Sequence, residues 1–453
     1  MTGGRDLKPV LSAVHERIDP TDAEREDLRA AVDELIARIE AELAEVDVDA
    51  DVVHVGSTAR DTWIRGDRDI DLFVRFPPAL DRSMLARLGL DIGNEVLPEG
   101  HEEYAEHPYV TGQYDGYDVD LVPCYRVESA RAIKSAVDRT PFHNAYLEEH
   151  IDTDTAGEIR LFKQFLKGIG VYGSDLRTEG YSGYLTELLI LEYGSFEEVL
   201  DAAAGWHPPV EFDPEDHGAR TFDDPLVVID PTDPERNVAA VVAPENVARL
   251  VHYARSFLAD PDESVFFPDP VEPLDAAEVR EFVEERATTP IAVVFDPPDL
   301  VDDQLYPQLR RSLDGVVRGL EHRGFDVYRS AAWVEEKGVL YVELASASLP
   351  AVERHEGPPV HAREHAKRFL DTYADDPDVY GPFIDGERYV VERERTPCSA
   401  AEFLAVEIQS VALGAHIETV LEEECFSLLE GAEVADLVPE FGTHLAEYYH
   451  PKP

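Results

Sequence analysis

The spacing of apolar side chains in residues 52–74 constrains the fold more than any other part of the chain. Residues 52–55 form a short apolar run that ends at Gly56-Ser57, and residues 69–74 alternate Asp with apolar side chains before Pro77-Pro78. Side chains of a strand alternate between its two faces. The pattern therefore predicts two strands joined by a polar, glycine-bearing connection, the second strand having an apolar face and an acidic face.

Hydrophobic periodicity elsewhere predicts a mixed α+β protein, and 453 residues suggest two or three domains. A Pro20-Thr21-Asp22 start precedes the first helical pattern. The predicted helices lie at 21–45, 156–200 with a glycine-rich break at 168–183, 244–259 and 362–373. The further predicted strands lie at 117–122, 291–295 and 339–344. Residues 261–275, rich in Pro and acidic residues, indicate a boundary, and no internal repeat occurs.

The chain has a formal net charge of −55, yet 44% of its residues are hydrophobic. A disordered acidic chain would be poor in the apolar residues that build cores, so we expect the charge to lie on folded surfaces. Acidic residues are spread from end to end. At molar salt the Debye length is about 3 Å and self-repulsion is screened, so the composition predicts a halophilic protein of a salty cytoplasm.

Acidity argues against nucleic-acid binding, because phosphate contacts normally need a basic patch. This argument weakens at high salt, where RNA binding relies on shape, stacking and a few Arg side chains. Cys124, Cys398 and Cys425 are far apart, which indicates neither a zinc site nor a disulfide framework. The N-terminus lacks an apolar leader and no run of about 18 apolar residues occurs, so we expect a cytoplasmic protein with no membrane contact.

The candidate chemistry lies on the predicted strands at 69–74 and 117–122. Asp69 and Asp71 point to the same side of their strand, and two such carboxylates repel unless a cation lies between them. A third carboxylate, from Asp118 or Asp120, would complete an oxygen-rich site suited to Mg²⁺. Spacing does not decide between these two, since both fall on one face. Such a site can activate a 3′-hydroxyl and hold a triphosphate for in-line displacement.

The Gly56-Ser57 turn fits the phosphates of such a substrate. Gly56 permits close backbone approach, Ser57 and a following helix start offer donors, and Arg60 supplies a forked cation. A lone D-x-D is usually a solvated edge and a lone Gly-Ser is usually a simple turn. Their order along the chain, followed by a strand with Asp118 and Asp120, is more specific and favours catalysis.

Several motifs resemble those of the archaeal, class I CCA-adding enzymes, which are tRNA nucleotidyltransferases of the DNA polymerase β-like superfamily. The resemblance covers nearly the whole chain. The matching segments are 56–73 (GSTARDTWIRGDRDIDLF), 118–126 (DVDLVPCYR), 140–143 (TPFH), 180–185 (GYSGYL), 230–238 (DPTDPERNV), 357–360 (GPPV) and 363–365 (REH).

The resemblance implies roles that spacing alone does not give. It makes Asp69, Asp71 and Asp120 the metal ligands, with Gly56 and Asp118 as further candidates for the site. Where this chain has Asp69 the family often has Glu; the Asp of this chain keeps the charge and shortens the ligand by one methylene. The resemblance also implies nucleotide-binding residues: Ser57, Arg60, His143, Lys163, Tyr172 and Arg236, the last helping to select the base. By spacing alone, His143, Lys163 and Tyr172 would be core or surface residues.

The implied architecture is a polymerase-β-like nucleotidyltransferase head, a helical neck and an α+β body with an inserted, tRNA-binding tail. The implied ranges are 1–152 for the head, 153–258 for the neck, 259–305 and 396–453 for the two parts of the body, and 306–395 for the tail. The implied reaction adds C, C and A to the acceptor end of tRNA from CTP and ATP, without a nucleic-acid template and with release of pyrophosphate. The resemblance also suggests a homodimer.

Other readings of the sequence remain open. The nearest is another nucleotidyltransferase of the superfamily, such as a poly(A) polymerase, which would lack the C-terminal segments. A phosphohydrolase with Asp69 as nucleophile expects a small hydroxylic residue soon after Asp71, whereas 72–74 are apolar. A tRNA-binding protein without catalysis would have no need of the carboxylates.

Overall fold

The computed structural model describes residues 7–104, 107–218, 221–422 and 426–453. The chain divides into an N-terminal unit, Met1–Asp269, which also takes in Pro453, and a C-terminal unit, Pro270–Lys452. This division falls inside the predicted boundary at 261–275. Cys124 and Cys398 are free thiols, and Cys425 lies outside the described residues.

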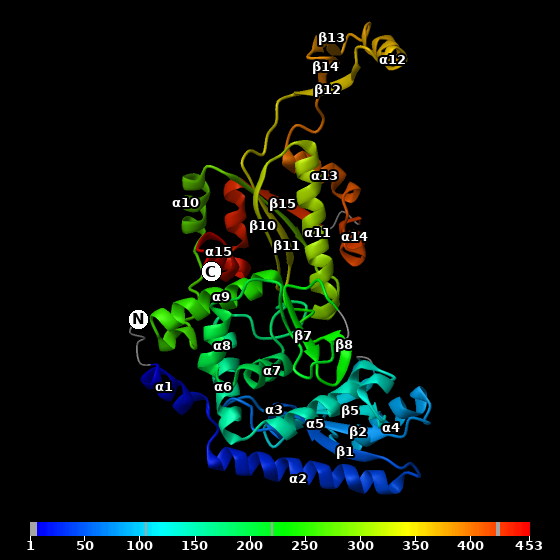
Figure 1. Ribbon diagram of the computed structural model, residues 1–453. Coiled ribbons are helices and arrows are strands. Elements are labelled where there is room, and N and C mark those ends of the chain that lie inside the picture. Colours follow the sequence, from blue (N-terminus) through cyan, green and yellow to red (C-terminus); the bar gives the residue numbers. More distant parts are fainter. Residues whose placement is uncertain (1–6, 105–106, 219–220, 423–425) are drawn as a thin grey trace. The chain divides into compact units, whose positions relative to one another are not determined.

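A five-stranded sheet carries the predicted acidic strand next to its central strand. Its strands are β1 (Asp51–Val55), β2 (Asp69–Phe76), β3 (His101–Tyr104), β4 (Pro108–Tyr114) and β5 (Tyr117–Tyr125). Their order is β1-β2-β5-β4-β3, and only the central β2 and β5 run parallel within this sheet (Figure 1). The strands predicted from the spacing at 52–55, 69–74 and 117–122 are confirmed. The β3–β4 hairpin was not predicted.

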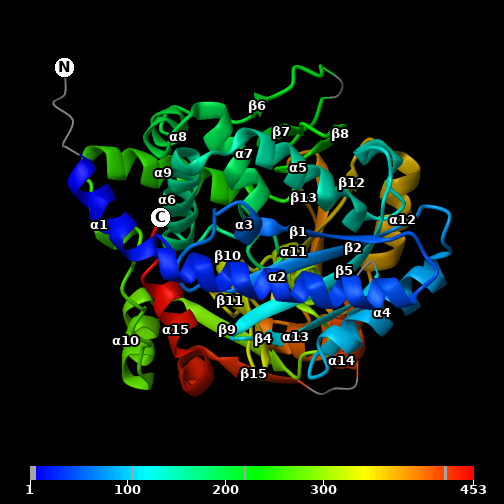
Figure 2. The same cartoon turned by 90° about the horizontal axis from the view of Figure 1, so that it is seen from below.

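Two helices, α2 (Asp22–Glu45) and α4 (Arg82–Val96), pack on the apolar face of this sheet (Figure 2). Alternate apolar residues of β2 and β5, such as Ile70 and Leu121, are fully buried in the same cluster as side chains of both helices. The predicted start of α2 is confirmed, because Thr21 and Glu24 form a reciprocal capping box. The acidic residues of β2 and β5 therefore project from the opposite face of the sheet.

The rest of the N-terminal unit is mainly helical and has a core rich in Phe. Its further elements are α1 (Lys8–Ile18), α3 (Gly56–Ala59), η1 (Ala130–Ala132), η2 (Ala136–Arg139), α5 (Thr140–His150), α6 (Thr153–Gly168), α7 (Gly183–Tyr193), α8 (Phe196–Ala203), β6 (Val210–Phe212), β7 (Leu226–Asp230), β8 (Asp233–Asn237), α9 (Pro244–Ala259) and η3 (Glu263–Val265). Phe165 lies at the centre of the core and meets three other rings edge to face, those of Phe196, Phe257 and Phe266. The helices predicted around 156–200 and 244–259 are confirmed.

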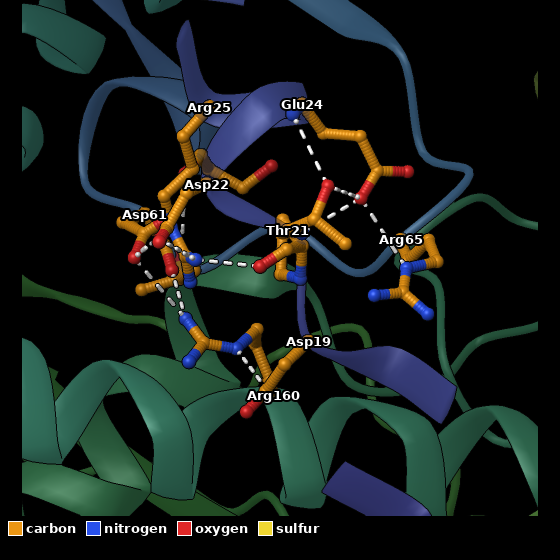
Figure 3. Close-up of polar contacts among 11 residues, drawn as sticks. Asp19, Thr21, Asp22, Glu24, Arg25, Asp61, Arg65 and Arg160 are labelled. Carbon is orange, nitrogen blue, oxygen red and sulfur yellow. Dashed lines mark hydrogen bonds and ion pairs between the residues drawn. The ribbon is translucent and has the colours of Figure 1, made fainter. Parts of the chain in front are cut away.

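A network of ion pairs fixes the loop that follows α3. Asp61 accepts from Arg25 of α2 at 2.8 Å, and Arg160 of α6 bonds both the carbonyl of Asp61 and, at 2.7 Å, the side chain of Asp19 (Figure 3). Asp61 has a φ of +59°, a conformation that few non-glycine residues adopt. The network holds this backbone against α2 and α6, and so positions the residues between α3 and β2.

The C-terminal unit is built on an antiparallel sheet with the order β10-β11-β9-β15. Its strands are β9 (Thr289–Phe295), β10 (Val327–Val334), β11 (Gly338–Leu344) and β15 (Phe426–Glu430), and its helices are α10 (Ala276–Arg286), α11 (Asp302–Arg323), α13 (Ala400–Glu407), η4 (Ile408–Ser410), α14 (Ala415–Glu422), η5 (Gly431–Leu437) and α15 (Val438–Tyr449). Residues of α11, α13 and α14 share one core with alternate residues of the sheet, and residues of α10 and α15 share the other. Strands predicted at 291–295 and 339–344 are confirmed.

A second sheet of the C-terminal unit has the order β12-β14-β13 and contacts one helix. Its elements are β12 (Val352–Pro359), α12 (Arg363–Tyr373), β13 (Val379–Asp385) and β14 (Arg388–Glu394). Within the predicted tail range 306–395, β10 pairs with β11 and β11 pairs with β9, so both belong to the first sheet of the unit and not to this one. The predicted domain boundaries themselves stay a prediction.

Among the described residues, no single helix is long and apolar enough to span a membrane. The segments Ala400–Ser410 and Ala415–Glu422 pass that test only as a pair, with a bend of 119° between them.

The Phe core yields a stability prediction. Replacement of Phe165 by Ala should lower the free energy of unfolding by about 3–5 kcal/mol, because it removes a fully buried ring and leaves a cavity among three others. Tyr104→Ala, in the same unit at a side chain that is 76% exposed, should change it by less than about 0.5 kcal/mol. Urea unfolding in molar KCl measures both, and equal effects would contradict this account of the core.

Candidate active site

The pairing of β2 with β5 decides which acidic residues are neighbours. In the parallel register Asp69 lies opposite Asp118 and Asp71 lies opposite Asp120. Asp69 and Asp118 are exposed at the strand ends, whereas Asp71 and Asp120 are half-buried. Asp118 is also bonded by the side chain of Gln113 at 3.1 Å. The geometry therefore favours Asp120 over Asp118 as the partner of Asp71, a choice that spacing left open.

The electrostatics of these side chains are those of crowded carboxylates. Burial, followed by repulsion from Asp120 and Asp69, raises the pKa of Asp71 to about 6. Burial and neighbouring Asp charges also raise the pKa of Asp69 and that of Asp120. Each carboxylate is thus harder to ionise than an isolated one, because it is partly buried and because like charges meet on one face of the sheet.

The carboxylates are adjacent, but they do not converge on one point. Within the described parts of the chain, no three Asp, Glu, His or Cys side chains are grouped closely enough to hold a metal ion. Neighbouring strands are only about 4.7–4.9 Å apart, so rotation about side-chain bonds is sufficient to bring Asp71 and Asp120 onto one cation. The type and charge of the donors fit a hard divalent cation.

Position 56 must be glycine because the carboxylate of Asp71 lies close to its backbone. Its φ is +83°, and a Cβ built there would lie 2.2 Å from Oδ2 of Asp71. Any other residue at this position would therefore be strained and would displace that carboxylate. Ser57 follows in the first turn of α3, where its carbonyl accepts from the backbone of Thr62 at 3.0 Å. The predicted phosphate contact of Ser57 stays a prediction.

Arg60 lies close to the carboxylates but is bound by other residues. Its guanidinium forms a forked ion pair with Glu187 of α7 at 2.8 and 3.0 Å and also bonds Asn144 of α5. The side chains of Arg60 and Glu187 are only 8% and 3% exposed. The positive charge of Arg60 nevertheless acts against the rise in the pKa of Asp71. A nucleotide contact of Arg60 stays a prediction, and it would have to share the guanidinium with Glu187.

Lys163 and Tyr172 come together beside Asp69. Lys163 and Lys167 of α6 both bond Asp67, at 2.7 and 2.9 Å. Both ammonium groups also lie 5.5 Å from the centre of the Tyr172 ring. The charge of Lys163 lowers the pKa of Asp69, against the effect of burial. Two cations thus share one carboxylate, which leaves net positive charge next to the acidic strand.

His143 and Arg236 converge on a residue that the sequence did not single out. Both donate to Oδ2 of Asp230, each at 2.8 Å. The His143 ring also stacks on Tyr184, with ring centres 3.9 Å apart and planes 13° apart. Asp230 is fully buried at the end of β7, while Arg236 is one-third exposed.

The start of α7 joins these groups. A side chain added at Gly183 would lie 3.2 Å from the Tyr172 hydroxyl, Tyr184 stacks on His143, and Glu187 binds Arg60. These three positions of α7 lie within five residues and reach Tyr172, His143 and Arg60. Three of the predicted nucleotide-binding residues, Arg60, His143 and Tyr172, are therefore brought together around the start of α7.

Sequence reasoning missed Asp67, Lys167, Tyr184, Glu187 and Asp230. Two of them carry a local signal: Lys167 is four residues after Lys163 on the same helix face, and Asp230 ends an apolar strand where an acidic residue needs a partner. Glu187 carries no such signal, because its partner Arg60 is 127 residues away in sequence.

Three protein-family models match the chain in succession. They are a nucleotidyltransferase domain over 36–143, the second domain of tRNA nucleotidyltransferases over 157–267, and the C-terminal domain of CCA-adding enzymes over 286–431. The first covers the five-stranded sheet with the acidic strands, and the second covers α7 and Asp230.

Curated relatives match over nearly the entire chain. A CCA-adding enzyme of Halobacterium salinarum is 60% identical over 99% of both chains. One of Halorubrum lacusprofundi is 59% identical over 99% of this chain and all of its own length. A CCA-adding enzyme of Methanosarcina acetivorans is 41% identical over 96% of this chain and 97% of its own. The predicted resemblance is thus confirmed, and the chain belongs to the family of CCA-adding enzymes and is a nucleotidyltransferase.

Proposed function

We propose that the chain adds C, C and A to the 3′ end of tRNA from CTP and ATP, at a site centred on Asp69, Asp71 and Asp120. The main support is the parallel register of β2 and β5, which sets Asp71 beside Asp120. Further support comes from the C-terminal unit, which a family model and the curated relatives also match. The 3′-hydroxyl of the RNA attacks the α-phosphorus of the nucleotide in line, and pyrophosphate leaves.

The carboxylates suit Mg²⁺, because this ion prefers oxygen ligands that carry negative charge. A bound divalent cation would supply Lewis-acid stabilisation of the phosphates and of the attacking oxygen. Asp69, Asp71 and Asp120 would hold it. The raised pKa of each of these carboxylates supports the assignment, since crowded negative charges gain most from a cation between them.

The triphosphate would lie toward the ammonium groups of α6. Lys163 and Lys167 present two positive charges against the single negative charge of Asp67. Phosphate oxygens can take part of these bonds while Asp67 retains the rest, so the lysines are oriented before the nucleotide arrives. Ser57 and Arg60 would complete the phosphate contacts, and Tyr172 would support both lysines from the ring face.

Base selection without a template requires polar groups at fixed positions. Arg236 and His143 are bonded to one buried carboxylate, which suits a pocket that rejects bases leaving its donors or acceptors unpaired. We expect G and U to be refused.

We also propose that the protein works at molar salt concentration. A net charge of −55 and relatives from Halorubrum and Halobacterium support activity at molar salt. A cytoplasmic location and a homodimer stay predictions from the sequence.

The reaction itself is tested with a tRNA that lacks its CCA end. In molar KCl with Mg²⁺, labelled CTP and ATP should be incorporated so that sequenced products end in CCA and stop there. Omission of ATP should give products that end in CC. A run of A residues would instead identify a poly(A) polymerase, and absence of incorporation would contradict the proposal.

Replacement of Asp71 tests the site. Asp71→Ala should abolish incorporation in this assay and leave tRNA binding in a filter assay largely unchanged, because the residue serves the cation and not the RNA. Asp91→Ala, on an exposed position of α4, is the matched control and should transfer nucleotides as the wild type does. Transfer by Asp71→Ala at the wild-type rate would refute the site assignment.

The pKa of Asp71 gives a prediction for stability. The pKa of Asp71 is about 6 in the fold against an ordinary 3.8. Ionised Asp71 therefore lowers the free energy of unfolding above pH 6, and this loss decreases as the pH falls through 6 and the carboxylate takes up a proton. With a chelator present, Asp71→Asn should therefore exceed the wild type in unfolding free energy by roughly 2–3 kcal/mol at pH 7.5. Thermal unfolding should show this gain shrinking at pH 5; a gain independent of pH would contradict the account.

A further inference from the structure

Glu187 of α7 is a buried carboxylate that binds two residues of the turn after α3. Its Oε2 accepts from Nη2 of Arg60 at 2.8 Å, and its Oε1 accepts from Nη2 and Nε of Arg60 at 3.0 and 3.3 Å. The same Oε1 accepts from the hydroxyl of Thr62 at 2.6 Å. Glu187, Arg60 and Thr62 all have buried side chains. Such a pair holds both charges in one geometry, because either charge alone would be buried without compensation.

The bond from Thr62 extends this hold to the backbone of the turn. The N–H of Thr62 donates to the carbonyl of Ser57 at 3.0 Å, which closes the turn that contains both Ser57 and Arg60. These two residues are the proposed phosphate contacts. One carboxylate therefore fixes the guanidinium of Arg60 and, through Thr62, the backbone that carries Ser57.

The bonds of Arg60 also determine which part of its guanidinium can meet a ligand. Glu187 takes Nε and Nη2, and the side chain of Asn144 accepts from Nη1. Within the described parts of the chain, these contacts use four of the five N–H groups of the guanidinium. One N–H of Nη1 is left for a phosphate oxygen, and its direction is set by Glu187 and Asn144.

The support runs from α7 to the turn. Leu185, Leu188 and Ile190 of α7 are buried in the same core as Phe165, so the helix that carries Glu187 is held by packing. Arg60, by contrast, follows α3, a helix of only four residues. A side chain on a packed helix is a more precise support than one on a short turn.

We propose that Glu187 is a positioning residue for nucleotidyl transfer: it orients Arg60 and the turn of Ser57 so that the triphosphate lies in line with the attacking 3′-hydroxyl. This inference rests on the proposed function and deepens it. Glu187 touches neither nucleotide nor RNA in this scheme. Its negative charge repels a triphosphate, so its benefit comes from orientation and appears in the rate of the bound complex.

Glu187→Gln in the full-length chain tests the inference. The amide keeps the shape of the side chain, but the charged, forked pair with Arg60 is lost. The assay measures the single-turnover rate constant at saturating CTP, with the protein in excess over tRNA that lacks CCA, in molar KCl with Mg²⁺. This rate constant should fall by about tenfold or more. The half-saturating CTP concentration should stay the same or fall, because a repelling charge is removed. A wild-type rate constant in the folded variant would overturn the inference.

Glu343→Gln is the matched control. Glu343 is buried in the C-terminal unit and accepts a forked pair from Arg286, at 2.6 and 2.9 Å, and a bond from the hydroxyl of Thr288. It thus has the same kinds of partner as Glu187, one guanidinium and one threonine hydroxyl. The control should transfer CMP at the wild-type rate. An equal fall in this variant would overturn the inference, because loss of any buried carboxylate would then have the same effect.

A double-mutant cycle shows whether Glu187 acts through Arg60. Arg60→Lys keeps the positive charge but has no fork for Glu187 to orient. Glu187→Gln should therefore slow transfer much less in the Arg60→Lys background than in the wild type, because both changes remove one interaction. Equal factors in the two backgrounds would contradict a positioning role.

The outcomes also separate this role from the proposed function. If the wild type adds no C, C and A, the proposed function fails. If the wild type does so and Glu187→Gln transfers at the same rate, the role of Glu187 fails alone. Should Glu187→Gln not fold, Thr62→Val removes one donor to Glu187 and keeps the shape of that side chain. It should lower the single-turnover rate constant by a smaller factor, and a wild-type rate would overturn the inference.

Discussion

The burial and crowding of carboxylates on one face of β2 and β5 determine the electrostatics of the candidate site. The parallel pairing of Asp71 with Asp120 sets two acidic side chains side by side, and burial and repulsion raise the pKa of Asp71 to about 6. The apolar residues between them, such as Ile70 and Leu121, are fully buried against α2 and α4. The same alternation that builds the core thus forces the carboxylates together. A fold that only needed stability would not keep them there, which supports the proposal that they serve a bound cation.

Cations are scarce in this chain, and several of them gather at the site. Only 40 of its residues are Lys or Arg, against 95 Asp and Glu. Lys163 and Lys167 share Asp67, Arg60 is bound by Glu187, and Arg236 is bound by Asp230. Each cation is oriented by an acidic partner within the N-terminal unit. Because molar salt screens exposed charges far more than buried ones, the buried pair of Arg60 and Glu187 keeps its geometry where long-range attraction of RNA would fail.

The sequence predicted what depends on local spacing. The capped helix at α2, the strands β1, β2 and β5, and the helices α6, α7 and α9 follow from apolar periods and turn residues, and the acidic face of β2 follows from alternation. It did not predict the antiparallel pair β3 and β4, of which β3 has only four residues and is polar. Nor did it decide between Asp118 and Asp120, because both lie on one face and only the register with β2 separates them. The partners Glu187 and Asp230 depend on contacts between distant segments, which no local pattern contains.

The central claim is that Asp69, Asp71 and Asp120 hold a divalent cation where the triphosphate meets the RNA end. An anomalous difference map from crystals of the full chain grown with Mn²⁺ and a non-reactive CTP analogue measures this directly. The account predicts a peak bonded to oxygens of Asp71 and Asp120, with Asp69 and the phosphates of the analogue on the same ion. A peak held by other side chains, or an ordered analogue with no peak between β2 and β5, would contradict it.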